Sequence, residues 1–102
     1  MKKVVYIAGP ITGVGRYWEA FEKVDDDLTS RGFTVLNPAR LPTGMTDAQY
    51  MRICFAMIDC ADAVFFLPRW KSSKGACLEN RYCLYTGKPT ARSIEELKEI
   101  FA

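Results

Sequence analysis

Short runs of apolar residues alternate along this chain with longer segments in which apolar and polar positions are mixed. The apolar runs are Val4–Ala8, Phe33–Leu36, Ala63–Leu67 and Pro89–Ala91. Short runs that are apolar almost throughout are typical of strands covered on both faces. We expect the last run to lie close to an edge of the sheet, because a proline cannot donate to a strand ladder.

The mixed segments have the three-to-four-residue periodicity of amphipathic helices. In the first of them, apolar residues recur at Trp18, Phe21, Val24 and Leu28 before Gly32. The expected helices are Trp18–Arg31, a segment capped by Thr46 or Asp47, a segment capped by Ser72 or Ser73 and ended by Gly87, and a last segment opened by the capping box Ser93–Glu96. The stretch 37–44 is rich in proline and glycine and is expected to be loop.

Alternation of strands and helices predicts an α/β protein with a parallel sheet and right-handed crossovers. We expect a Rossmann-like or flavodoxin-like three-layer domain with four to five strands, in which Ala63–Leu67 is central. A chain of 102 residues has room for a single domain, residues 1–102. Because the first apolar run is short, we expect no signal or membrane segment at the N-terminus, and we expect a cytoplasmic protein with no membrane partner.

The composition of the chain argues against several kinds of catalysis and binding. The chain has no histidine, which excludes Ser-His and Cys-His catalysis. The spacing of its cysteines, Cys54, Cys60, Cys77 and Cys83, matches no zinc or redox pattern, so buried free thiols are expected and no metal site. Neither GxGxxG nor GxxxxGK[ST] is present, and no cofactor is expected. A formal net charge of +2 is too small to indicate a nucleic-acid polymer as partner.

Three loops that follow the predicted strands contain cations: 9–16, 37–40 and 68–75. In a parallel sheet, ligands bind beyond the carboxyl ends of the strands. A basic, glycine-containing rim beside a helix N-terminus suits phosphate or another anion. The alternative is that arginines and lysines favour exposed loops, and loop composition alone leaves both interpretations open.

Glu79 is the most informative single residue, because it falls on the apolar side of its helix. Its neighbours at helical spacing include Gly75, Ala76 and Cys83, and none is a cation. A carboxylate buried there without a partner would cost several kcal/mol or have a raised pKa. It therefore faces a polar cleft, meets a partner from elsewhere in the fold, or lies in solvent.

Four sequence patterns resemble the nucleoside 2-deoxyribosyltransferase superfamily. They are YIAGPITG at 6–13, NPA at 37–39, YMR at 50–52 and LPRWKSSKGACLE at 67–79, and they occur in the family's order. The resemblance runs from Tyr6 to Pro89 and is closest to a short, largely uncharacterised branch of that superfamily.

The resemblance implies cleavage or transfer at the N-glycosidic bond of a (deoxy)nucleoside or nucleoside monophosphate. Glu79 would attack the anomeric carbon, Tyr6 would orient it, and the sugar would pass to another base or to water. The expected substrate-binding residues are Gly9, Pro10, Ile11, Thr12, Gly13, Asn37, Arg69, Trp70, Ser73 and Gly75. The resemblance also implies a small-molecule partner and a homodimer or higher homo-oligomer.

Three positions depart from the family pattern. Cys54 stands where the family has an aspartate that holds the sugar and assists departure of the base, and a thiol is a poor substitute for both tasks. Pro10 and Thr12 stand where the nucleotide hydrolases of the family have serine and arginine. Asp47 or Asp59 could cover the missing role. The alternative to an enzyme is a weak or inactive protein that binds or senses nucleotides on the same scaffold.

Overall fold

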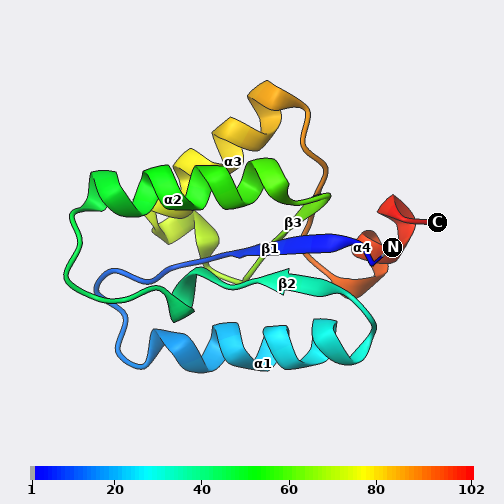
Figure 1. The fold of residues 1–102 in the computed structure, drawn as a ribbon, viewed down its shortest axis with the longest axis horizontal. Coiled ribbons are helices and arrows are strands. Elements are labelled where there is room, and N and C mark those ends of the chain that lie inside the picture. Colours follow the sequence, from blue (N-terminus) through cyan, green and yellow to red (C-terminus); the bar gives the residue numbers. More distant parts are fainter. Residues whose placement is uncertain (1) are drawn as a thin grey trace.

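The computed structural model describes residues 2–102 and contains one parallel sheet (Figure 1). Its strands lie in the order β2-β1-β3-β4, and every neighbouring pair is parallel. The strands are β1 (Val4–Ala8), β2 (Thr34–Leu36), β3 (Ala63–Phe66) and β4 (Thr90–Ala91). The predicted parallel sheet is therefore confirmed, with β3 inside the sheet and the proline-preceded β4 at an edge.

Helices cover both faces of the sheet. They are α1 (Tyr17–Ser30), α2 (Asp47–Cys60), α3 (Lys74–Thr86) and α4 (Ile94–Ile100), with short 3-10 helices η1 (Pro38–Arg40) and η2 (Trp70–Ser72). One buried cluster joins the sheet to α2 and α3, and a second joins it to α1 and α4. This is the expected three-layer, Rossmann-like or flavodoxin-like arrangement.

The strand β1 shows why its sequence is apolar throughout. Val5 and Ile7 belong to the cluster under α1 and α4, whereas Tyr6 and Ala8 belong to the cluster under α2 and α3. Successive side chains of a strand point to opposite faces, so both sets are buried. The phenol of Tyr6 is thereby directed into the layer that contains α2 and α3.

The helix ends follow the capping signals. The hydroxyl of Thr46, not Asp47, caps α2, in a complete capping box with Gln49. Ser73, not Ser72, caps α3, and Gly87 ends that helix with φ of +78°. Ser93 caps α4 as expected. These hydrogen bonds fix where α3 begins and hence which side of it faces the sheet.

Three expectations from the sequence are wrong. The stretch 37–44 is not all loop, since Asn37 caps the 3-10 helix η1 by accepting a hydrogen bond from the backbone of Ala39. Trp18 does not join the buried face of α1, because 47% of it is exposed at the helix start. Cys60 is exposed at the end of α2, whereas Cys54 and Cys83 are the buried thiols.

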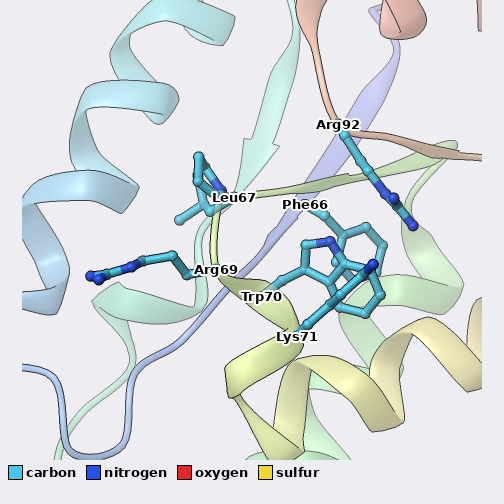
Figure 2. Close-up of a pocket in the computed structure, with 7 residues that line it drawn as sticks. Phe66, Leu67, Arg69, Trp70, Lys71 and Arg92 are labelled. Carbon is cyan, nitrogen blue, oxygen red and sulfur yellow. The ribbon is translucent and has the colours of Figure 1, made fainter.

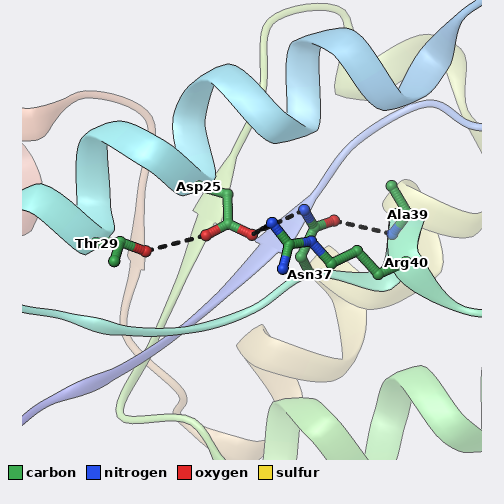
Figure 3. Close-up of polar contacts among 5 residues, drawn as sticks. All are labelled: Asp25, Thr29, Asn37, Ala39 and Arg40. Atoms are coloured by element: carbon green, nitrogen blue, oxygen red, sulfur yellow. Dashed lines mark hydrogen bonds and ion pairs between the residues drawn. The ribbon is translucent and has the colours of Figure 1, made fainter.

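Asp25, on α1, is a buried carboxylate that contacts one of the basic loops, residues 37–40 (Figure 3). Its carboxylate accepts hydrogen bonds of 3.0 Å from both Thr29 and Asn37, and its distance to the guanidinium of Arg40 is 3.5 Å. Asp25 thus ties η1 and the end of β2 to α1. No helix among residues 2–102 is long and apolar enough to cross a membrane.

Candidate functional site

A carboxylate and a phenol meet beneath α3, inside the cluster that α2 and α3 form with the sheet. Glu79 is 4% exposed and Tyr6 is fully buried. The hydroxyl of Tyr6 donates a hydrogen bond to the carboxylate of Glu79 across 73 positions of sequence. The sequence left three possibilities open for Glu79, and the structure shows the second of them: its carboxylate meets a partner from elsewhere in the fold. That partner is a neutral donor on β1.

Cys54, on α2, is the third member of this buried group: it packs in the same cluster as Tyr6, and its thiol is close enough to Tyr6 and Glu79 to exchange effects on the pKa with both. It is 7% exposed. Three elements therefore converge on one point: the middle of β1, the middle of α2 and the second turn of α3. We call Tyr6, Cys54 and Glu79 the buried polar group.

Burial dominates the ionisation of this group. Loss of solvation raises the pKa of Glu79 to about 7, although the hydrogen bonds from Tyr6 and Cys54 oppose the rise. Burial also raises the pKa of Cys54 to about 11, so its thiol stays protonated at neutral pH. The pKa of Tyr6 is raised by burial and by the charge of Glu79. Near neutrality, Glu79 is thus the member of the group that exchanges a proton.

Small residues shape the space around α3 and the end of β1. A Cβ atom at Gly9 would lie 2.8 Å from the side chain of Leu67, so only glycine allows this close approach. A Cβ atom at Gly75 would lie 3.6 Å from the sulfur of Met51 and 3.9 Å from the hydroxyl oxygen of Ser73. Ser73 already accepts a hydrogen bond from Ala76, and its hydroxyl proton remains available as a donor.

The loop after β1 is half-buried in its first part and exposed in its second part. Pro10 and Ile11 are half-buried, and Ile11 packs against the cluster under α1 and α4, on the other side of the sheet from Glu79. Thr12 and Gly13 are exposed in a turn closed by a hydrogen bond of 3.2 Å from Val14 to Ile11. The exposed half of this loop has no contact that fixes it on the buried polar group.

Asn37 and Arg69 do not join the buried polar group. The amide of Asn37 donates to Asp25 and accepts from Ala39, so both of its ends are used within η1 and α1. Arg69 has φ of +69°, and its side chain points away from Trp70 and Lys71 (Figure 2). Of the expected binding residues, Gly9 follows the end of β1 directly, and Ser73 and Gly75 lie at the start of α3.

Neither proposed substitute for the missing aspartate lies in the buried polar group. Asp59 accepts a hydrogen bond of 2.6 Å from Tyr82 near the opposite end of α2. Asp47 is exposed in the first turn of α2, seven residues and about 10 Å of helix from Cys54. Asp62 accepts a hydrogen bond from the backbone N–H of Val4, which is a structural role.

Three aromatic residues that could stack on a base have structural contacts of their own. Tyr82 stacks on Phe55 with ring centroids 4.3 Å apart, and the hydroxyl of Tyr50 donates to the backbone of Pro42. Trp70 packs on Phe66, with 5.0 Å between ring centroids. No group of three or more histidine, cysteine or acidic side chains within residues 2–102 is placed to hold a metal ion.

A groove of about 270 Å³ lies at the carboxyl end of β3, and we call it the Trp70 groove (Figure 2). It is lined by Phe66, Leu67, Pro68, Arg69, Trp70, Lys71 and Arg92. Arg69 and Trp70 were among the expected binding residues, whereas Arg92 was not. Arg92 follows β4 directly, so the rule that ligands bind at the carboxyl ends of parallel strands could have indicated it.

The comparisons with known proteins give a family but no activity. The model of the family described as Domain of unknown function (DUF4406) matches residues 3–91, and the chain belongs to that family. No protein with a curated description matches the chain.

Proposed function

We propose that this DUF4406 protein acts at the N-glycosidic bond of a (deoxy)nucleoside or nucleoside monophosphate, with Glu79 as nucleophile. The observation that supports it is the buried contact between the Tyr6 hydroxyl and the Glu79 carboxylate. The resemblance of the sequence to nucleoside 2-deoxyribosyltransferases assigns these same two residues to nucleophile and orienter. A buried carboxylate with no cationic partner is also costly to maintain, and groups perturbed in this way cluster at functional sites.

In this mechanism an ionised oxygen of Glu79 attacks the anomeric carbon of the sugar. The glycosidic bond breaks, its electron pair leaves with the base, and a covalent glycosyl-Glu79 ester forms. Water or a second base then attacks the same carbon and releases Glu79. Because burial raises the pKa of Glu79 to about 7, roughly half of the molecules hold the nucleophile in its ionised form at neutral pH.

Tyr6 has a positioning role in this proposal. Its hydroxyl donates to the carboxylate and stabilises the charged form, while the surrounding cluster prevents the phenol from turning away. The sugar or its phosphate would enter between Gly9 and the start of α3, where the hydroxyl proton of Ser73 is free to donate and Gly75 has no side chain to obstruct a ligand.

The second candidate function is nucleotide binding without turnover, and Cys54 favours it. The contact partner of Glu79 on α2 is a thiol whose pKa is about 11, which makes it a weak proton donor to a departing base. The carboxylates of Asp47 and Asp59 lie away from it.

The test is base release or base exchange from a panel of deoxynucleosides and their monophosphates, followed by chromatography. Glu79→Gln keeps the size of the side chain and its ability to hydrogen-bond with Tyr6 but removes the nucleophile, so we expect loss of product. Glu95→Gln is the matched control, since Glu95 is exposed on α4. Turnover by Glu79→Gln at the wild-type rate would refute the proposal.

Binding without chemistry is detected separately. Calorimetric titration of the wild-type protein with each compound that raises its melting temperature distinguishes the two candidates. Saturable binding with no base release over long incubation selects the binding protein, whereas binding with release selects the enzyme.

We also propose that the chain assembles as a homo-oligomer. The outer face of α3 exposes 46% of Leu78, 72% of Leu84 and 92% of Tyr85, and a subunit contact would cover them. Analytical ultracentrifugation tests this, and a monomer at high concentration would contradict it.

A further inference from the structure

Two cations converge on one indole ring in the Trp70 groove. The guanidinium of Arg92 lies 4.9 Å from the centroid of the Trp70 ring, and the ammonium of Lys71 lies 5.8 Å from it. Figure 2 shows the two side chains reaching this ring from different segments, Lys71 from η2 and Arg92 from the segment after β4. Tertiary folding, and not neighbourhood in sequence, brings these two positive charges together.

Neither side chain forms an ion pair within residues 2–102, although the carboxylate of Glu96 accepts a hydrogen bond from the backbone N–H of Arg92. The ion pairs within residues 2–102 are formed by Arg16, Arg31 and Arg40. The lining of the Trp70 groove contains no aspartate or glutamate. Two like charges on one ring repel each other, and the attraction of each to the ring offsets only part of that cost. An anion between them would remove the repulsion and accept hydrogen bonds from both.

The floor of the groove is buried and apolar. Trp70 and Phe66 are both buried, and each packs in the cluster beneath α3. Leu67 is buried in the cluster on the other face of the sheet. Charges above a low-dielectric wall are screened less than charges on an open surface, so an anion held here interacts more strongly with its cations than it would on a free loop.

The position and volume of the groove limit its ligand. It lies beyond the carboxyl ends of β3 and β4, the edge of a parallel sheet where ligands bind. A volume of about 270 Å³ is just below the range of about 300–1,000 Å³ for small-molecule sites. A phosphate group with a small attached sugar suits that volume.

We propose that the Trp70 groove binds the phosphate group of a small phosphate monoester through Lys71 and Arg92. This site is separate from the buried polar group, because neither Tyr6, Cys54 nor Glu79 lines the groove. The proposal therefore does not depend on glycosidic chemistry at Glu79.

The indole signals of the two tryptophans provide a direct readout, because the other one, Trp18, is on α1. We expect inorganic phosphate and ribose 5-phosphate, added at constant ionic strength, to shift the Trp70 indole signal in a saturable way in nitrogen-proton NMR spectra. The signal of Trp18, assigned by Trp18→Phe, should not move. If ribose 5-phosphate binds at least as tightly as inorganic phosphate, the result supports a monoester as the ligand. If ribose 5-phosphate does not bind, the proposal is overturned.

Charge-matched double variants identify the groups responsible. Lys71→Gln with Arg92→Gln should weaken binding roughly tenfold or more, the effect of losing one or more charge-assisted hydrogen bonds. Lys23→Gln with Arg81→Gln removes the same charge from exposed positions on α1 and α3 and should leave affinity unchanged. Equal weakening by both pairs would show nonspecific attraction and overturn the proposal.

Glu79→Gln separates this site from the proposed active site. We expect the shift of the Trp70 signal in Glu79→Gln to match the wild type, whether or not the protein cleaves nucleosides. Loss of the phosphate-induced shift in Glu79→Gln would overturn the separation of the two sites.

Discussion

Replacing Tyr6 with phenylalanine removes the one hydroxyl that donates to Glu79 and leaves the ring that fills the core. A hydrogen bond to a charged group contributes about 1.5–3 kcal/mol. Since 1.36 kcal/mol corresponds to one pKa unit, the loss should raise the pKa of Glu79 from about 7 to roughly 8 or 9. At pH 7 the ionised fraction would then fall from about half to ~1–10%.

The measurement is a titration of glutamate carboxyl carbons by NMR in wild-type and Tyr6→Phe proteins. Glu79→Gln assigns the relevant signal by its disappearance. If Glu79 is the nucleophile, the pH profile of base release in Tyr6→Phe should move to higher pH by the same amount, because activity follows the ionised carboxylate. The titration itself needs no substrate and is informative even for a protein without turnover.

Tyr50→Phe is the matched control, because it also removes a phenol hydroxyl, one that donates to the backbone of Pro42. Its Glu79 titration should match the wild type. An unchanged or lower pKa of Glu79 in Tyr6→Phe would refute the claim that the Tyr6 hydrogen bond stabilises the charged carboxylate.

Three further predictions concern stability and activity. Because the folded-state pKa of Glu79 is raised from 4.5 to about 7, the protonated carboxyl stabilises the fold at low pH, and that contribution is lost as the pH rises to about 7. The free energy of unfolding of Glu79→Gln, measured in urea, should therefore rise by up to ~3 kcal/mol relative to that of the wild type between pH 4.5 and pH 8. A difference between the two proteins that does not change with pH would contradict this. Asp25→Ala should lower the free energy of unfolding by ~2–4 kcal/mol, since its three partners lose a buried acceptor, whereas Asp26→Ala, at an exposed position, should change it little. Cys54→Asp should increase base release if the missing carboxylate limits turnover, and no increase in a folded Cys54→Asp would show that it does not.

The order of strands and helices could be predicted from the sequence, because the apolar runs of the strands and the three-to-four-residue repeat of the helices are both clear. Strand β1 is bounded as predicted, since an apolar run ended by Gly9 leaves little freedom for its limits. Trp18 was misplaced because helical periodicity does not show that the first turn of α1 extends beyond the sheet. The burial of Asp25 could not be predicted, because its three partners come from both its own helix and the following loop.

Part of the candidate site follows from local reasoning and part does not. The inward orientation of Glu79 was indicated by its spacing from Ala76 and Cys83, and the structure buries all three. The position of Cys54 beside Glu79 and the convergence of Lys71 and Arg92 depend on how separate elements pack. Contacts of this kind have no periodic signature in one sequence, so they required the structure.

Cys54 affects the two halves of the proposed reaction in opposite ways. A second carboxylate at this position would repel the charge of Glu79 and raise its pKa further, whereas the thiol donates a hydrogen bond that lowers it. Cys54 therefore favours an ionised nucleophile at neutral pH. The same thiol, with its pKa raised to about 11, transfers a proton to a departing base poorly. If the protein turns over, its preferred substrates should be those whose bases leave without protonation from this side, and rates should rise with leaving-group acidity more steeply than in Cys54→Asp.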